Sequence, residues 1–478
     1  MISKLITIIF LISLVSTLWM VWKYQLNLKN EALITKVLTV MFFGYILAVT
    51  YIYVNTLHWN KPVLFLTMLT FCPFVGFLLM IFKKYEYAGD LNIFVLAIML
   101  NCLGLVGLYR LDIDSGWFLT GAIGYEEKVP MVLKQELYSM VALCGMTWGI
   151  TKGIFDKILL KIADSSGAIF WGVCAFVLLA LPKLLGLSTW LTTDKSIQPS
   201  EFAFKIIFLL FISKYYDSKA PELLLKHYPF KEVVKLVLFI IIGIVVFFFA
   251  PLVLLAKELG TVLLIGLTFI IWTSYITRRV SFFFAGIAFL VVAMYLGVLT
   301  SDHVAKRVIA AWLEWKQFAF KPFSEGGNLY PGYQIFTALA AIRLSPWGVG
   351  IGNGILKHAT VNKTIIPMAV NDFAAIPLAA EMGIIAIFVI GVSYLVLLDK
   401  AIPLNRTLNF RSILAAGIAI ALITQGFYNL SGVIALLPAT GIPLPWISYG
   451  GSALFANYIL AGFLVTILNG QNEALDEK

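Results

Sequence analysis

The chain has 478 residues, of which 61% are hydrophobic and 13% charged, and its mean hydropathy is +0.94. Soluble domains have roughly 45–50% apolar residues, so this composition excludes a soluble globular protein and indicates an all-α, polytopic membrane protein. The net charge of +10 is typical of the basic loops of membrane proteins, and we expect no nucleic-acid partner.

Apolar runs long enough to cross a bilayer recur along the whole chain. We predict thirteen spans, at 2–22, 33–56, 62–82, 91–109, 134–152, 167–187, 199–216, 234–256, 257–276, 280–300, 369–398, 410–435 and 446–469. The first run lacks a small-residue cleavage site, which favours a retained span over a signal peptide. Cys72, Cys102, Cys144 and Cys174 all fall inside apolar runs, as expected of packing residues.

Basic residues predict the orientation, because Lys and Arg collect on cytoplasmic loops. If the spans alternate, the basic loops 23–32, 83–90, 153–166, 217–233, 277–279 and 399–411 share one face. That face is predicted to be the cytoplasm. The N-terminus and the long segment 301–368 then lie outside, and the tail 471–478 lies inside.

A polar cluster opens the predicted span at 199, where the sequence reads QPSEFAFK. Glu201 and Lys205 are four residues apart and therefore lie on one helix face, where they can pair. Two interpretations stay open from these residues alone. The pair is either a capping acid with a neutralising Lys or part of a polar cavity.

The segment 301–368 is basic although it is predicted to lie outside. One explanation for its basic residues is that long loops cross the membrane regardless of their charge. Alternatively, cations such as Lys306 and Arg307 meet an anionic head group, because a diphosphate needs several fixed donors.

Two acids fall within the predicted span 369–398, where the sequence reads NDFAAIPLAAEMG. Asp372 and Glu381 are nine residues apart, or two and a half turns, so they do not share one face closely. Either Asp372 caps the outer end while Glu381 faces the bundle, or both line an irregular cavity. Spacings typical of His or Cys metal sites and of a phosphate-binding glycine loop are absent from the sequence.

The stretch PATGIPLPWISYGGS, at 438–452, connects the last two apolar runs. Pro and Gly are ordinary loop residues, but the interleaved Ile442, Leu444, Trp446 and Ile447 are not needed in a loop free in water. We therefore predict a stiff, partly buried wall on the outer side. Ser448 and Ser452 are placed to donate hydrogen bonds, either to a cap or to a lipid diphosphate.

Six motifs together resemble the SEDS family, the RodA/FtsW/SpoVE proteins of bacterial cell-wall synthesis. They are GLYRLD (107–112), QPSEFAFK (198–205), ELGTVLL (258–264), GYQIFTALAAIRLSPWGVGIGNG (332–354), NDFAAIPLAAEMG (371–383) and LPATGIPLPWISYGGSALFANYILAG (437–462). The resemblance covers roughly 91–470, a core of ten spans including the outer loop 301–368. Residues 1–90, with three further spans, are identified as an N-terminal extension.

The resemblance implies a peptidoglycan glycosyltransferase that polymerises lipid II, a disaccharide-peptide on undecaprenyl diphosphate. It implies the bacterial cytoplasmic membrane, an active site on its outer face, and a class B penicillin-binding protein among other elongation or division proteins as partner. No protein-bound cofactor is implied, although the substrate diphosphate is able to carry Mg²⁺. Residues at the matching motifs, Tyr333, Gln334, Asp372, Ser448 and Ser452 among them, join Glu201, Lys205, Lys306 and Arg307 as candidates for substrate binding.

The chain departs from the family at the residue expected to act as general base. The family carries an Asp shortly before Gly-Tyr-Gln, and here Gln317 stands at that position if Trp315 is aligned with the family Trp. Glu325, beside two glycines, is our candidate replacement, with Glu314 and Asp302 as alternatives. Two other functions stay open. One is a flippase for the lipid-linked precursor, because polar residues at membrane depth are also expected of a transporter. The other is an inactive scaffold for a penicillin-binding protein, which the missing Asp favours.

Overall fold

A computed structural model of the chain describes residues 2–55, 62–115, 130–165, 167–187, 198–218, 229–251, 259–300, 305, 331–353, 369–402, 409–438 and 441–476. Every regular element in these ranges is a helix, which confirms the predicted all-α class. The chain divides into two compact units. The first comprises 1–144, 297–396 and 425–450, and the second comprises 145–296, 397–424 and 451–478.

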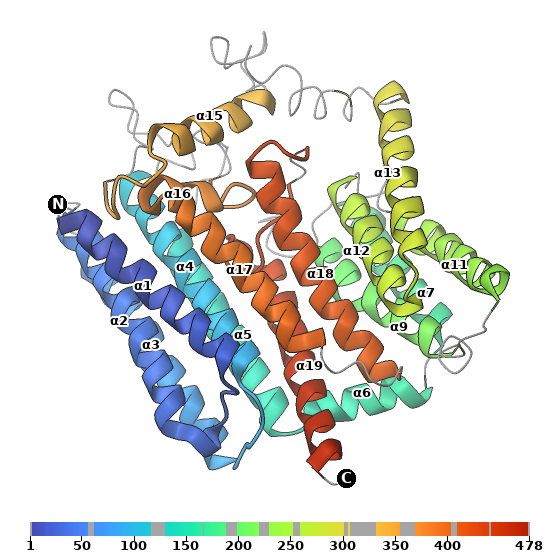
Figure 1. The fold of residues 1–478 in the computed structure, drawn as a ribbon, viewed down its shortest axis with the longest axis horizontal. Helices are drawn as coiled ribbons and strands as arrows, with labels where there is room; N and C mark the ends of the chain where they lie inside the picture. The colour runs from blue at the N-terminus through green and yellow to red at the C-terminus, as the bar shows by residue number, and fades with distance from the viewer. Residues whose placement is uncertain are drawn as a thin grey trace. The chain divides into compact units, whose positions relative to one another are not determined.

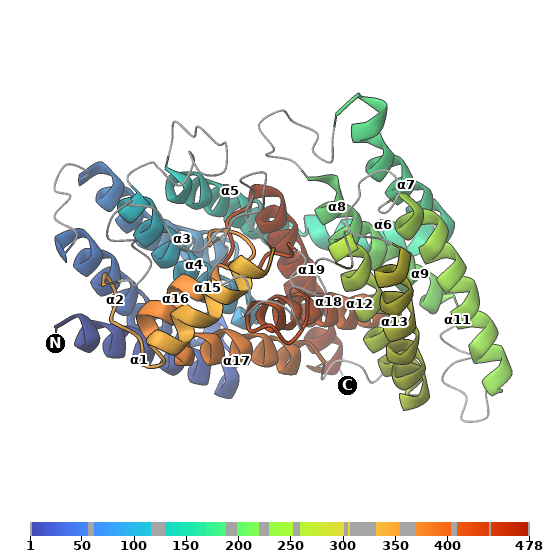
Figure 2. The same ribbon diagram turned by 90° about the horizontal axis from the view of Figure 1, so that it is seen from above.

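The first unit is built around α4 (Asn92–Ser115), whose residues 92–112 are buried on all sides. Two N-terminal helices, α1 (Ile2–Lys23) and α2 (Glu31–Asn55), pack against this centre, and a third, α3 (Pro62–Lys84), packs against α2 and touches α4 through the rings of Phe82 and Phe94. Figures 1 and 2 show α1 and α2 side by side, next to α4. The same unit holds α15 (Pro331–Leu344), α16 (Ala375–Met382), most of α17 (Ile384–Ala401) and most of α5 (Met131–Thr151).

The second unit contains the helices of the middle of the chain and its C-terminal helix. They are α6 (Ile154–Ser165), α7 (Ala168–Leu184), α8 (Pro199–Phe202), α9 (Leu209–Asp217), α11 (Phe230–Ile244), α12 (Leu259–Thr277), most of α13 (Val280–Thr300), the first part of α18 (Phe410–Val433) and α19 (Gly451–Asp476). A π-helical stretch, Ala203–Phe208, joins α8 to α9. A second one, Val245–Phe249, extends α11.

Nine of the described helices are long and apolar enough to cross a membrane, or up to ten if the bent pair α6–α7 is one span. The chain is therefore a multi-pass membrane protein. Thirteen spans were predicted, and three of them are not among these ten: 134–152, 199–216 and 280–300. Polar residues lie in α5 and in the 199–217 helix, whereas α13 (Val280–Thr300) coincides with the predicted span 280–300.

Three predicted boundaries are wrong. The region 369–398 is not one span, because a turn at 369–374 precedes α16 and Gly383, at φ +80°, separates α16 from α17. The predicted loop 153–166 contains the amphipathic helix α6, which buries Phe155, Leu159 and Ile162. The last helix begins at Gly451 rather than at 446.

In the first unit, the helix ends that were predicted to lie on the same side of the membrane contact one another. At one end, Lys83 forms an ion pair with Glu31 at 2.9 Å, and Asn92 donates to the Tyr24 carbonyl at 3.1 Å. At the other end, residues near the start of α1 contact residues 349–353, which follow α15. Loops 23–32 and 83–90 therefore share a face, and the chain start shares one with part of segment 301–368.

Candidate functional site

Residues 441–450 of the first unit form a packed wall, as predicted. Ile442, Leu444, Trp446 and Ile447 are all buried. Side chains from α18, α17, α4 and α5 donate to its backbone carbonyls: Gln425 to Pro443 (2.7 Å), Tyr394 to Pro445 (3.0 Å), Asn101 to Trp446 (3.3 Å) and Gln135 to Ser448 (3.1 Å). Irregular backbone away from water needs such partners, because an unpaired buried carbonyl is costly.

Ser448 is used inside this wall. Its hydroxyl donates to the Asn371 carbonyl at 2.6 Å and accepts from the Leu444 amide at 2.8 Å. The Tyr449 amide donates to the Val370 carbonyl at 2.9 Å, so the wall is joined to the turn before α16 by two bonds. The Ser448 hydroxyl therefore bonds to loop backbone rather than capping a helix, and its predicted bond to a substrate diphosphate stays a prediction.

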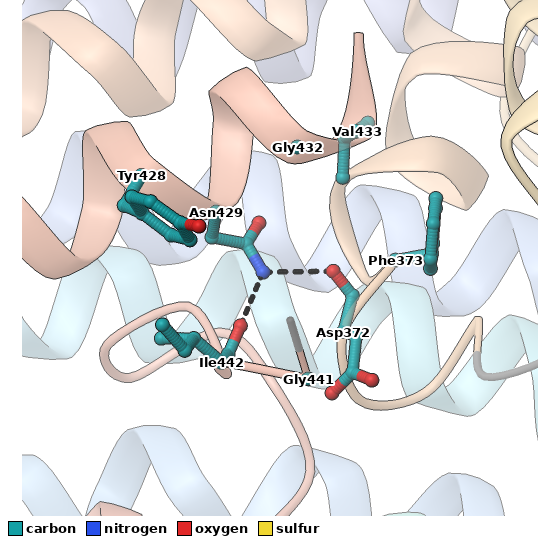
Figure 3. Close-up of a pocket in the computed structure, with 8 residues that line it drawn as sticks. All are labelled: Asp372, Phe373, Tyr428, Asn429, Gly432, Val433, Gly441 and Ile442. Carbon is teal, nitrogen blue, oxygen red and sulfur yellow. Dashed lines mark hydrogen bonds between the residues drawn. The ribbon is translucent and has the colours of Figure 1, made fainter. Parts of the chain in front are cut away.

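A pocket lies between this turn, α18 and the start of the wall (Figure 3). Its lining residues are Asp372, Phe373, Tyr428, Asn429, Gly432, Val433, Gly441 and Ile442. The Asn429 side-chain amide donates to the carbonyls of Asp372, at 2.7 Å, and Ile442, at 2.6 Å. These bonds fix the two backbone segments that border the pocket. Gly441, at φ +79°, lies beside the Asp372 carboxylate, which is half-buried.

The two acids predicted on one span are separated. Asp372 lies in the turn at 369–374 and lines the pocket, whereas Glu381 lies in the last turn of α16. Asp372 is not the cap of α16, because the N-cap residue is Ala374 and makes no side-chain capping bond. Only one of the two acids therefore faces the cavity of Figure 3.

Glu381 forms a buried ion pair with Arg110, whose Nε lies 2.8 Å from the carboxylate. Both side chains are less than a tenth exposed. Arg110 was not predicted as a site residue, although it is a charged residue at the end of an apolar run and within the GLYRLD motif. Asn429 and Gln135 were also missed, and nothing but their polarity within apolar runs marks them in the sequence.

The pair predicted between Glu201 and Lys205 is confirmed in the second unit, with Lys205 Nζ 2.7 Å from the Glu201 carboxylate. The Lys205 side chain is only 1% exposed, and its ammonium also donates to the Ala453 carbonyl at 3.4 Å. Lys205 lies in the π-helical stretch, a deviation that often occurs at functional sites. A buried ammonium is stable only with a partner of opposite charge, so the Lys205 side chain depends on Glu201.

Ser452 is the neighbour of this pair at the start of α19. Its hydroxyl accepts a hydrogen bond from the Gln198 amide at 2.9 Å, directly before Pro199 begins α8. The backbone amides at the start of a helix have no partner within the helix. The Ser452 hydroxyl bonds the amide of Gln198, the residue directly before α8. Ser452 therefore has a local structural use besides the predicted contact with substrate.

Several predicted site residues lie outside the described ranges. These are the candidate base Glu325, its alternatives Glu314 and Asp302, the cations Lys306 and Arg307, and Gln317. Tyr333 and Gln334 lie in the first turn of α15, but their side chains are outside the description. Among the residues that are described, no three His, Cys, Asp or Glu side chains form a group that could hold a metal ion.

Comparison with known proteins identifies the family of the chain. The profile of the cell cycle protein family FtsW/RodA/SpoVE matches residues 90–473. The peptidoglycan glycosyltransferase RodA of Mycobacterium tuberculosis (strain H37Rv) is 28% identical over 424 residues, which cover 85% of this chain and 84% of that protein. The probable peptidoglycan glycosyltransferase FtsW of Nitrosomonas europaea is 27% identical over 391 residues, or 79% of this chain and 92% of that protein.

A solved structure shares the fold. It is described as "Structural coordination of polymerization and crosslinking by a peptidoglycan synthase complex" and superposes with a TM-score of 0.52 at 17% identity. The match covers 80% of this chain and 99% of that one. Because the family profile spans most of the sequence, the chain belongs to the FtsW/RodA/SpoVE family of cell cycle proteins.

Proposed function

We propose that this chain is a peptidoglycan glycosyltransferase that polymerises lipid II into glycan strands at the outer face of the bacterial cytoplasmic membrane. The observation that carries the proposal is the similarity of the chain to a relative named peptidoglycan glycosyltransferase RodA, which covers 84% of the length of that relative. The buried polar groups at the family motifs support it. A chain that only filled the membrane would have no need of an ammonium as deep as that of Lys205.

The proposed chemistry is one inverting displacement. The 4-hydroxyl of the acceptor sugar loses its proton to a general base, attacks the anomeric carbon of the donor, and displaces the diphosphate. We propose Glu325 as the base, because Gln317 cannot accept a proton at neutral pH. Lys306 and Arg307 are proposed to stabilise the charge that develops on the leaving diphosphate, which also carries any Mg²⁺ the reaction uses.

The described residues contribute a place for the polar part of the substrate. We propose that Asp372, half-buried at the pocket of Figure 3, accepts hydrogen bonds from sugar or peptide groups. The wall at 441–450 gives this pocket a rigid side, because its backbone is bonded to four helices. A rigid wall lets binding energy be used to orient the reactants.

A crosslinking enzyme is the proposed partner. The matched solved complex couples polymerisation and crosslinking, so we propose a class B penicillin-binding protein for this chain. Other membrane proteins of cell elongation or division are proposed to assemble with the pair.

The function is tested with purified protein, alone and with a penicillin-binding protein, incubated with fluorescent lipid II. Moenomycin is added, because it inhibits the unrelated glycosyltransferase domains that contaminate such preparations. A ladder of glycan strands is expected, with heat-treated protein as the blank. If no ladder forms under conditions in which a related enzyme is active, the proposal is wrong, and a flippase or a scaffold then has to be considered.

A further inference from the structure

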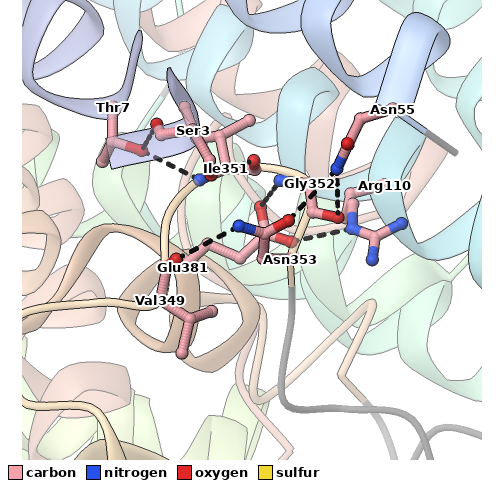
Figure 4. A network of polar contacts seen from close by, with 9 residues as sticks. All are labelled: Ser3, Thr7, Asn55, Arg110, Val349, Ile351, Gly352, Asn353 and Glu381. Carbon is pink, nitrogen blue, oxygen red and sulfur yellow. Dashed lines mark hydrogen bonds and ion pairs between the residues drawn. The ribbon is translucent and has the colours of Figure 1, made fainter. Parts of the chain in front are cut away.

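The two first helices contact a short segment of the core that follows α15. We call residues 349–353 the strap. Helices α1 and α2 lie before residue 90, where the family match begins, yet their polar side chains bond the strap directly (Figure 4). All of these residues belong to the first unit.

Helix α1 holds the middle of the strap with two hydroxyls. Ser3 and Thr7 are one turn apart, so they lie on one face of the helix. The Ser3 hydroxyl donates to the Ile351 carbonyl at 2.8 Å, and the Ile351 amide donates to the Thr7 hydroxyl at 2.8 Å. Both polar groups of the Ile351 backbone are therefore bonded to α1. The three residues are buried, so water does not replace these bonds.

Close approach of backbone to helix explains the glycines of the strap. Gly350 has φ +98°, and a Cβ there would collide with the Ser3 side chain. Gly352 has φ +83° and lies against Tyr51 of α2. Asn55, at the end of α2, donates to the Gly352 carbonyl at 3.4 Å and to the Asn353 side chain at 3.1 Å.

The other side of the strap is bonded to α16. The Val349 amide donates to the Ala380 carbonyl at 3.1 Å, and the Gly350 amide donates to the Glu381 carbonyl at 2.8 Å. The Gly352 amide donates to the Glu381 carboxylate at 3.3 Å, and the same carboxylate pairs with Arg110 of α4. The strap therefore lies between the N-terminal helices and the core, with bonds to both.

Helix α15 ends at Leu344, residues 345–348 join it to the strap, and both α15 and the strap contact α16. Ser345, directly after α15, donates to the Ala380 carbonyl at 3.2 Å, and Ile335, Ala338 and Ala341 form the buried stripe of the helix. The first turn of α15 carries Tyr333 and Gln334, two of the predicted substrate-binding residues. A shift of the strap would move the end of α15 with it.

We propose that α1 and α2 are a positioning element of the enzyme: through Ser3, Thr7 and Asn55 they hold the strap in register and thereby fix helix α15 for catalysis. This inference rests on the proposed glycosyltransferase function. The bonds of Ser3 and Thr7, and one of the two bonds of Asn55, go to strap backbone, so they set the register of the chain. A slip by one residue would break both bonds of Ile351 at once. Ser3, Thr7 and Asn55 are positioning residues, since they touch the strap and not the reacting atoms.

The test compares two double variants of the full chain, with the purification tag at the C-terminus. Ser3→Ala/Thr7→Val removes both hydroxyls that hold Ile351. Ser13→Ala/Thr17→Val makes the same chemical change in the same helix at buried positions, where the Ser13 hydroxyl donates to the Phe10 carbonyl and to no other group of the described residues. A single Thr7→Ser variant keeps the hydroxyl and serves as the conservative rescue.

Two quantities are measured: amide hydrogen exchange of peptides covering 331–353, and the rate of lipid II polymerisation. In Ser3→Ala/Thr7→Val, we expect exchange of the Ile351 amide to rise at least about tenfold, because two bonds are lost. Polymerisation is expected to fall about tenfold or more, because a displaced group near a reaction centre reduces the rate strongly. The control pair and Thr7→Ser are expected to keep both quantities near those of the parent chain.

Either of two results overturns the inference: exchange in 331–353 that does not change in Ser3→Ala/Thr7→Val, or raised exchange with polymerisation equal to that of the parent. An equal loss of polymerisation in the control pair overturns it as well, because the loss then reflects general destabilisation of α1. Failure of the proposed function looks different, since the parent chain itself then makes no ladder. The exchange comparison still decides in that case whether α1 holds the strap.

Discussion

Lys205 shows how much one buried charge depends on its partner. Its ammonium is almost fully withdrawn from water and lies 2.7 Å from the Glu201 carboxylate. We expect Lys205→Met to reduce the free energy of unfolding by about 3–5 kcal/mol, because it leaves the acid buried without its cation. The double variant Lys205→Met/Glu201→Gln is expected to regain most of that loss, since both charges are gone. Thermal unfolding in detergent measures both effects.

An exposed pair is the matched control. Lys235 and Glu232 are paired at 2.7 Å on α11, but their side chains are 71% and 45% exposed. Lys235→Met is expected to change stability by less than about 1 kcal/mol, as is usual for surface pairs. If Lys205→Met costs no more than Lys235→Met, the buried pair does not stabilise the fold. If the stable double variant also fails to polymerise lipid II, the pair serves the reaction as well.

The general base is a second prediction at the scale of one residue. We expect Glu325→Gln to lower the polymerisation rate by about 10²–10⁴-fold, the usual contribution of a positioned base. Binding of fluorescent lipid II is expected to persist, because the amide keeps the shape of the acid. Glu314→Gln and Asp302→Asn are tested in parallel. Polymer that survives Glu325→Gln and is lost with either of these would assign the base elsewhere.

Polar pairs within one helix could be predicted from the sequence, whereas pairs far apart in the sequence could not. Glu201 and Lys205 could be predicted because a spacing of four fixes their geometry. Arg110 and Glu381 are 271 positions apart, and only the tertiary fold brings them together. The same holds for Asn429, whose two bonds reach residues of two other segments.

Among the elements, the wall at 441–450 depends on side chains from four helices, which bond to its backbone. Asn429→Leu leaves the carbonyls of Asp372 and Ile442 without the donor they have now. We expect a loss of about 1–3 kcal/mol for each buried carbonyl left unpaired, measured by thermal unfolding. Thr424→Val, on the same helix, is the control, because its buried hydroxyl has no hydrogen-bond partner among the described residues. An equal effect of both variants would contradict the anchoring role of Asn429.

The break between α16 and α17 shows why one element was mispredicted. Hydrophobicity continues across 369–398, so the pattern alone indicates a single span. The interruption depends on Gly383, at φ +80°, and on the contact of that glycine with the turn at Pro346–Gly348. A single glycine in an apolar run is compatible with a continuous helix, so the sequence does not reveal such a break.

At the scale of the molecule, hydrophobicity and charge predicted the class and the arrangement of helix ends, but not the use of the N-terminal helices. The division at residue 90 stays a prediction. What the contacts add is that α1 and α2 cover α4, which is therefore buried on all sides. Composition cannot tell a helix that faces lipid on one side from one that packs against its neighbours, because both are apolar.

The predicted sidedness of the membrane is the last test. Asn353, on the exposed side of the strap, is expected on the outer face with the start of the chain, and Lys84, at the end of α3, is expected in the cytoplasm. Asn353→Cys is therefore expected to react with a membrane-impermeant maleimide on intact cells, and Lys84→Cys only after permeabilisation. The parent chain is the background control, because its four cysteines lie in apolar runs. The contacts at the two ends of the first unit require the two positions to lie on opposite faces. The reverse pattern would therefore turn the whole unit over and place the strap and helix α15 in the cytoplasm, on the wrong side for a polymerase that builds glycan strands outside the cell.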